Sequence, residues 1–228
     1  MQKTISFITD TLHVTAGQTI FEQCCGIGTM SLAIAQNNIK TIGVDIIPDY
    51  ISRAQKKAQE NRLNCLFYAE NAYHFKTKTL CDGAINWWTS FAYDPDDTVN
   101  IKMLNRVHES LKPGGKFILD FMNSQKSKHT FKKTKTTTEH YNHNGIHSIW
   151  RSEYHKKTNM ITKSWAVEKT DGSISTLKQG GGVKCYEPKD FERLFSEAGF
   201  KNLHFLGSIN GETYTKDSPR LIIVAEKA

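Results

Sequence analysis

Residues 19–45 read TIFEQCCGIGTMSLAIAQNNIKTIGVD. An apolar run ends near Glu22, and Gly26 and Gly28 follow at once; a helix-like segment comes next, and a second apolar run ends in Asp45. This order of strand, glycine turn, helix and strand is typical of the nucleotide-binding half of a doubly wound α/β fold. Because glycine has no Cβ, the backbone of the turn can lie against a ligand. An acid at the end of the second strand can accept hydrogen bonds from a ribose diol.

The spacing within this stretch discriminates between two nucleotide ligands. A dinucleotide fingerprint requires a third glycine, where this chain has Ser31, and it holds a pyrophosphate at the helix N-terminus. Glu22 would repel a pyrophosphate, whereas it would suit a positively charged sulfonium or ammonium group. The stretch therefore indicates S-adenosylmethionine as the cofactor.

Length and composition fit one α/β domain with an elaboration, since the chain has 228 residues. No apolar run reaches about 18 residues, so we expect no transmembrane helix and no membrane partner. The N-terminus lacks a signal-peptide pattern. The five cysteines are scattered and form no CxxC motif, which argues against a disulfide framework or a metal site. We therefore expect a cytoplasmic protein whose cysteines act as small core residues.

Alternating helical and extended segments predict a doubly wound, mainly parallel sheet. The expected helices cover Met1–Gly17, Thr29–Gln36, Asp49–Asn61, Asp96–Leu111 and Glu187–Ala198. The expected strands cover Thr19–Gln23, Thr41–Asp45, Leu66–Ala69, Cys81–Trp88, Lys116–Met122, Leu203–Leu206 and Leu221–Ala225.

Residues 125–184 differ in composition from the rest of the chain: they are rich in Thr, Lys, His, Tyr and Trp and contain short stretches in which apolar and polar residues alternate. Asp171-Gly172 is a hairpin-turn signal between extended runs. We therefore expect an antiparallel β insert after the fifth strand. The chain would then divide into a core of residues 1–124, an insert of residues 125–184, and a C-terminal helix and closing hairpin of residues 185–228.

The stretch that begins at Glu22 resembles motif I of the class I S-adenosylmethionine-dependent methyltransferases, whose usual form is acid-x-G-x-G-x-G. Cys24 stands where the first glycine is usual, and we expect a β-region or right-handed helical backbone there. Further stretches similar to this class are KPGGKFILD (112–120), EPKDFERLFSEAGF (187–200), SPRLIIVAEK (218–227) and NWWTSFAYDPDD (86–97). The last two resemble a subgroup of small-molecule N- and O-methyltransferases of the sugar and natural-product type.

The resemblance implies a set of ligand-binding residues. The predicted cofactor-binding residues are Glu22, Cys24, Cys25, Gly26, Gly28, Asp45, Ile46, Asn71, Ala72, Asn86 and Trp87; the predicted substrate-binding residues are Trp88, Phe91 and Tyr154. The glycines could instead form a plain turn, and Asp45 could be a helix N-cap. The adenine acceptor is Asn71, or Glu70 if the register shifts by one residue. Trp87 and Trp88 could be core residues, but their place after the fourth strand favours one of them facing the cleft.

The methyl group of a sulfonium is already activated, so the enzyme mainly has to align the acceptor with the C–S bond. A neutral amine needs no strong base, whereas a hydroxyl acceptor benefits from one, most often a histidine. The insert supplies the candidates His129, His140, His143, His147 and His155. Each of them could equally be an exposed side chain of the insert sheet.

The charge of the chain is concentrated in residues 126–163, which hold nine Lys and Arg against two Glu, a net charge of +7 that equals the formal net charge of the whole chain. This tract could steer an anionic small substrate, follow a phosphate backbone, or simply be a solvated sheet edge. We predict methyl transfer to N or O of a small molecule. An RNA methyltransferase is the second hypothesis, since no RNA-binding module is appended, and a non-catalytic S-adenosylmethionine-binding regulatory protein is the third.

Overall fold

The computed structural model describes residues 1–134, 136–143, 146–168, 172–176 and 181–228. Its larger sheet has seven strands in the order β11-β12-β5-β4-β1-β2-β3. Their bounds are β1 Thr19–Gln23, β2 Lys40–Asp45, β3 Cys65–Ala69, β4 Cys81–Asn86, β5 Leu111–Met122, β11 Phe200–Leu206 and β12 Arg220–Lys227. β1 to β5 pair in parallel, while β12 runs antiparallel to both β5 and β11. The predicted mainly parallel sheet is therefore confirmed.

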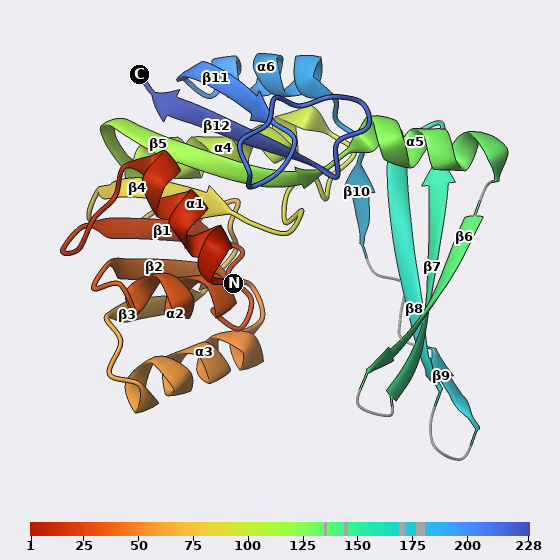
Figure 1. The fold of residues 1–228 in the computed structure, drawn as a ribbon, viewed down its shortest axis with the longest axis horizontal. Coiled ribbons are helices and arrows are strands. Elements are labelled where there is room, and N and C mark those ends of the chain that lie inside the picture. Colours follow the sequence, from red (N-terminus) through yellow and green to blue (C-terminus); the bar gives the residue numbers. More distant parts are fainter. Residues whose placement is uncertain (135, 144–145, 169–171, 177–180) are drawn as a thin grey trace.

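Helices cover both faces of this sheet (Figure 1). One face carries α1 (Gln2–Leu12), α2 (Thr29–Ala35) and α3 (Pro48–Glu60), and the other carries α4 (Asp97–Ser110) and α6 (Pro188–Glu197). The apolar positions of α1 recur at helical spacing and bury Ile5, Ile8 and Leu12 against the sheet. Each side of the sheet thus has its own apolar core.

The helix starts follow local capping chemistry, which is why they were predictable to within a few residues. The Asp96 side chain accepts a hydrogen bond from the Thr98 amide at the start of α4. At the start of α6, Glu187 and Asp190 form a capping box, with Pro188 in the first helical position. The predicted end of the fourth strand at Trp88 is wrong: β4 ends at Asn86.

The insert departs from the prediction in its first ten residues. Ser124–Lys133 forms a helix, α5, capped by the Asn123 side chain, which accepts a hydrogen bond from the Lys126 amide. The segment lacks a helical repeat of apolar residues, since Phe131 is its one large apolar side chain, so the sequence pattern did not show it. Its capping residue and its contacts with β7 define it instead.

The rest of the insert forms the expected antiparallel sheet. The strands are β6 Thr136–His143, β7 Ile146–His155, β8 Met160–Glu168, β9 Ile174–Thr176 and β10 Gly182–Lys184. Their order is β10-β8-β7-β6, with β9 paired to β8. This sheet extends away from α5 on one side of the core (Figure 1). Asp171 of the predicted hairpin turn lies outside the described residues, although β8 and β9 on either side of it pair antiparallel.

The chain order reverses between β1 and β4, because β2 and β3 extend the sheet on one side of β1 and β4 and β5 extend it on the other. The carboxyl ends of strands at such a reversal form the ligand crevice of open α/β sheets. Among the described residues, no helix is both long and apolar enough to cross a bilayer.

Candidate functional site

A cavity of about 760 Å³ lies where the first four strands end. Its walls come from the turns after β1, β2, β3 and β4. Predicted ligand-binding residues that line it are Cys24, Cys25, Gly26, Asp45, Ile46, Asn71, Ala72 and Trp88. Residues that were not predicted and also line it include Tyr50, Arg53, Tyr73, Ser90 and Tyr93. The sheet reversal therefore produces the expected crevice.

The turn after β1 has a left-handed backbone at three positions. Gly26 has φ 54° and Gly28 has φ 75°, and Cys24 has φ 60°. The prediction of an extended or right-handed helical backbone at Cys24 is wrong: the cysteine adopts the conformation for which a glycine is favoured. A Cβ added at Gly28 would lie 2.9 Å from the Phe67 ring and 3.0 Å from the Ala54 Cβ. Gly28 is therefore needed for helix–strand packing, and Gly26, with open space around it, for its backbone angle.

Asp45 ties the two strand ends together. Its Oδ2 accepts a hydrogen bond from the Gly26 amide at 2.9 Å, and its Oδ1 accepts one from the Ile47 amide at 3.0 Å. A carboxylate has about four acceptor positions, so two remain for a ligand in the cavity. Ile47 is the N-cap of α3 and its side chain forms no cap, so Asp45 is not the N-cap residue.

Glu22 does not line the cavity. It is 2% exposed, and its carboxylate accepts hydrogen bonds from the Ser31 amide at 2.8 Å and from the Ser31 hydroxyl. Burial raises the pKa of Glu22 from 4.5 to about 7. Ser31, which occupies the third-glycine position, is thus the partner of the buried acid, and the Glu22 side chain lies behind the cavity wall.

Asn71 and Glu70, the two candidates for the adenine acceptor after β3, lie in different places. Asn71 lines the cavity, with its Oδ1 accepting a hydrogen bond from the Tyr73 amide at 2.9 Å. Glu70 is exposed and lines a different depression beside β3. The Asn71 amide group keeps free hydrogen-bonding capacity toward the cavity.

The two tryptophans after β4 also lie in different environments. Trp87 is 5% exposed and packs into the core against Phe7 of α1, whereas Trp88 is 57% exposed and lines the cavity. Trp88 and the following Thr89 have φ angles of 60° and 62°, so the extended backbone of β4 does not continue through them. Phe91 is fully buried among core rings. The structure therefore places Trp87 and Phe91 in the core, and neither lines the cavity.

Asn86 lies fully buried at the end of β4. Its amide nitrogen donates to Gln23 Oε1 at 3.2 Å and to the Ser90 carbonyl at 3.0 Å. Its Oδ1 has no partner among the described residues. A buried acceptor without a partner is rare in folded proteins and indicates a group that a ligand or water completes.

A second cavity, of about 400 Å³, lies between the core and the insert. The core contributes Trp88, Thr89, Tyr93, Met122 and Arg220; the insert contributes Ile161, Lys163, Trp165, Gly181 and Val183. Trp88 and Tyr93 line both cavities. Burial raises the pKa of the Tyr93 hydroxyl to about 12 even though 44% of the residue stays exposed, so this group remains a donor at neutral pH.

The Trp88 turn is held by a charged pair from two strands. Asp120 is buried on β5 and binds Arg220 of β12 through both carboxylate oxygens, at 2.8 and 2.7 Å. The same carboxylate accepts the Trp88 amide at 3.0 Å, and Arg220 donates to the Thr89 hydroxyl at 2.8 Å. These bonds hold in place a backbone turn that is strained by the positive φ angles of Trp88 and Thr89.

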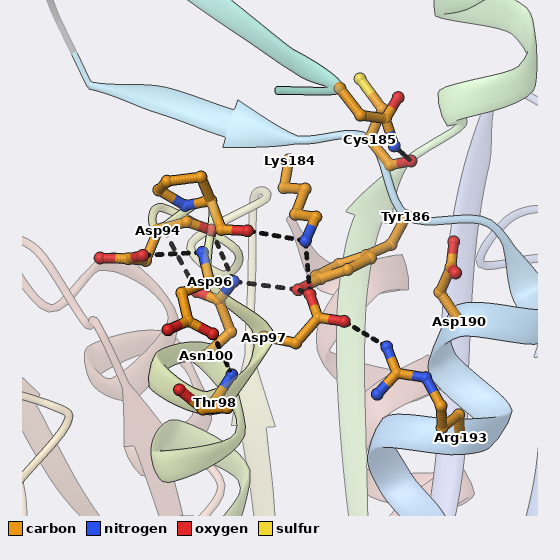
Figure 2. A network of polar contacts seen from close by, with 12 residues as sticks. Asp94, Asp96, Asp97, Thr98, Asn100, Lys184, Cys185, Tyr186, Asp190 and Arg193 are labelled. Carbon is orange, nitrogen blue, oxygen red and sulfur yellow. Dashed lines mark hydrogen bonds and ion pairs between the residues drawn. The ribbon is translucent and has the colours of Figure 1, made fainter. Parts of the chain in front are cut away.

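A second network fastens the end of the insert to the core (Figure 2). Asp97 at the start of α4 accepts hydrogen bonds from Lys184 at 2.6 Å and from the Tyr186 hydroxyl at 2.5 Å, and it also binds Arg193 of α6. Lys184 further donates to the Pro95 carbonyl at 2.7 Å. The hydrogen bonds from these donors lower the pKa of Asp97, so it is ionised at neutral pH. The loop that carries Tyr93 is thereby tied to the last strand of the insert.

The remaining predicted residues of the insert lie away from both cavities. Tyr154 stacks on Phe131 with ring centroids 6.0 Å apart. His140 lies 3.3 Å from His147, whose other ring nitrogen lies 2.5 Å from Glu168. His129 and His155 line separate surface depressions, and the side chain of His143 lies outside the described residues. No described histidine lines either cavity, and no group of described residues could hold a metal ion.

Comparison with known proteins identifies the family. The family model described as "Methyltransferase domain" matches residues 15–205, which is most of the chain. The chain belongs to this methyltransferase family. The enzyme is an S-adenosylmethionine-dependent methyltransferase with the predicted fold and cofactor.

Individual relatives agree with this assignment. A protein of Geobacillus sp. (strain WCH70) that is named as a methyltransferase is 24% identical over 91% of this chain and 84% of its own length. The crystal structure of an S-adenosylmethionine-dependent methyltransferase from Clostridium acetobutylicum has a TM-score of 0.84 at 16% identity, covering 100% of this chain and 92% of that one. The sugar N-methyltransferase KedS8 from a Streptoalloteichus species has a TM-score of 0.73 at 13% identity over 99% of this chain and 85% of its own. An rRNA (uracil-C5) methyltransferase of Francisella tularensis is 30% identical but covers 41% of this chain and 20% of its own length.

Several residues of the site were not predicted from the sequence. Tyr93 lies within the tract that was singled out after the fourth strand, so its aromatic character was a usable signal. Arg220 and Asp120 are 100 residues apart, and their pairing across β12 and β5 has no local sequence signal. Lys163 belonged to the basic tract, but nothing separated it there from the other lysines.

Proposed function

We propose that the enzyme transfers a methyl group from S-adenosylmethionine to nitrogen or oxygen of a small-molecule acceptor. The donor would bind in the cavity at the ends of β1 to β4, and the acceptor would bind in the cavity between the core and the insert. The observation that carries this proposal is that Trp88 and Tyr93 line both cavities. Two reactants placed on either side of these rings can be aligned for in-line displacement, which is the main catalytic task.

The residues of the first cavity fit the donor. Asp45 has acceptor capacity left for the ribose hydroxyls, and Asn71 offers its amide group to the adenine. Asn86 is fully buried and lines neither cavity, so it would support the wall through its bond to the Ser90 carbonyl. The left-handed backbone at Cys24 and Gly26 brings main-chain atoms to the ligand. When bound, S-adenosylmethionine supplies an activated methyl group.

The described residues that line the two cavities bear on whether the acceptor atom is nitrogen or oxygen. Asp45 is the one carboxylate among the described residues that line the two cavities, and none of these residues is a histidine. Tyr93 stays protonated at neutral pH, and burial raises the pKa of the Cys24 thiol, so it does not become a thiolate. A neutral amine attacks without a base. We therefore favour nitrogen over oxygen as the acceptor.

The RNA hypothesis ranks second. Lys156 and Lys157, two lysines of the basic tract, line a surface depression with His155 and not the cavity beside Trp88. The acceptor cavity of about 400 Å³ suits a small molecule. The rRNA methyltransferase of Francisella tularensis matches over only 41% of this chain.

The test is a transfer assay with tritiated S-adenosylmethionine. Small amines, small phenols, tRNA and rRNA are offered separately, and polymers are separated from small molecules by acid precipitation before counting. We expect saturable counts in the soluble fraction, with amines preferred. A Trp88→Ala variant should lose most of this transfer, because Trp88 lines both cavities. Tyr141→Ala, whose side chain lines neither cavity, is the aromatic control on the insert. Saturable counts in the precipitated RNA alone would contradict the proposal.

A further inference from the structure

The cavity between the core and the insert is positively charged. Lys163 and Arg220 line it, and no acidic residue is among its described lining. Asp120 is the acid nearest to Arg220 in the bonding network, but its side chain is 4% exposed and lies beneath the wall. An acceptor in this cavity therefore meets two cationic groups and no exposed carboxylate.

Lys163 contributes a charge that the protein does not neutralise. It lies on β8 between Ile161 and Trp165, and the three side chains share one face of the strand because alternate residues point the same way. It forms no ion pair with any described residue, whereas Arg220 in the same cavity pairs with Asp120, and Lys184 nearby pairs with Asp97. A lysine with an unpaired ammonium group in a cavity wall is a ready partner for an anion.

Arg220 contributes directed donors. Its Nε and one terminal nitrogen are occupied by Asp120 and Thr89. The other terminal nitrogen makes no hydrogen bond with described residues, so two N–H donors remain. Since the buried carboxylate already fixes the guanidinium, little conformational freedom is lost when these donors bind a ligand. The pair with Asp120 has no net charge, so Lys163 supplies the net attraction and Arg220 the geometry.

The same cavity offers ring surfaces. Trp88, Tyr93 and Trp165 line it, and Trp165 is braced by Trp150 on the neighbouring strand with ring centroids 5.6 Å apart at 26°. Stacked aromatic rings present flat apolar faces that suit a planar or cyclic ligand. Rings and cations occur together in this wall, so the ligand should combine a ring with an anionic group.

We propose that the methyl acceptor is a ring compound with an anionic substituent, a carboxylate or a phosphate, that is bound by Lys163 and the free terminal nitrogen of Arg220. The ring lies against Trp165, and the accepting atom points toward Trp88 and Tyr93. This inference rests on the proposed function and adds the substrate class. It also assigns anion recognition to one lysine of the basic tract and not to the tract as a whole.

The experiment is calorimetry on the full chain saturated with S-adenosylhomocysteine. Three matched probes are titrated: 4-aminobenzoate, its neutral amide 4-aminobenzamide, and 4-aminophenyl phosphate. We expect at least one anion to bind about tenfold more tightly than the amide, which is about 1.4 kcal/mol. The two anionic arms distinguish carboxylate from phosphate. Lys163→Gln should remove most of this preference and leave the affinity for the amide unchanged, and Lys163→Arg should restore it.

Lys156→Gln is the matched control, because Lys156 lies on the same insert and lines neither cavity. It should keep the preference for the anions. Three outcomes would overturn the inference. The unmodified protein could bind the anions and the amide equally, the preference for anions could fall equally in Lys163→Gln and Lys156→Gln, or neither anion could show saturable binding. Methyl transfer to the three probes is measured in parallel: anion binding without any transfer would count against the proposed function alone, and transfer that is indifferent to Lys163 would count against this inference alone.

Discussion

Replacing Glu22 by glutamine should change how the stability of the enzyme depends on pH. Glu22 is almost completely buried, and burial raises its pKa from 4.5 to about 7. The folded protein therefore binds a proton that the unfolded chain releases between these two values. Stability consequently falls as the pH rises from about 4.5 to about 7 and levels off above that range. The variant has no such proton and should lack this component.

The size of the effect follows from the two pKa values. A pKa difference from 4.5 to about 7 corresponds to about 3 kcal/mol in the free energy of unfolding. Glutamine has nearly the same shape, and its carbonyl oxygen can still accept from the Ser31 amide. The difference in stability between variant and parent should therefore widen by up to about 3 kcal/mol between pH 4.5 and pH 7, in favour of the variant.

Urea denaturation at half-unit pH steps, followed by circular dichroism, measures this difference. Glu70→Gln is the matched control, because Glu70 is exposed and its substitution should leave the pH profile of the parent almost unchanged. The change of the gap with pH is the informative quantity, since its absolute size includes unrelated effects of the amide. Parallel profiles for Glu22→Gln and the parent would refute the account of Glu22 as a buried acid with a raised pKa.

Three further predictions concern the turn after β1, with Asp45 that binds it, and the backbone turn at Trp88 and Thr89. Asp45→Ala should weaken S-adenosylhomocysteine binding by about 1–3 kcal/mol, measured by calorimetry, because it removes a carboxylate from the cavity and releases the Gly26 amide; unchanged affinity would exclude the ribose role. Gly28→Ala should lower the free energy of unfolding by about 1–3 kcal/mol, measured in urea, and by more than Gly26→Ala. Both glycines have positive φ, but only a Cβ at Gly28 would meet neighbouring atoms. Equal losses for the two variants would mean that Phe67 and Ala54 can move aside at no cost. Asp120→Ala should cost about 2–3 kcal/mol of stability, less than a fully buried pair because the Arg220 side chain is 35% exposed and can reach water. It should also change the acrylamide quenching of tryptophan emission, because the Trp88 amide loses its bond to Asp120; an unaltered quenching constant would show that the pair does not position Trp88.

The sequence determined the features that depend on neighbours along the chain. Gly26, after the first strand, and Asp45, at the end of the second strand, are 19 residues apart, and the bond from the Gly26 amide to Asp45 follows from that register. The alternation of helices and strands determined the parallel sheet, and the change of texture after Asn123 determined an added antiparallel sheet. Capping residues placed the starts of α4 and α6, because they act within one helical turn.

Tertiary structure decided what these elements present to a ligand. Nothing local distinguished Trp87 from Trp88, because the choice depends on a left-handed turn held by Asp120 and Arg220 from two other strands. The helix α5 was also decided by packing, since its sequence has no apolar repeat. The cavity between the core and the insert exists because residues of β8 and β10 face the loop after β4. Contacts between distant segments depend on which faces of the folded elements meet, and this information is spread over the whole chain instead of being contained in any one motif.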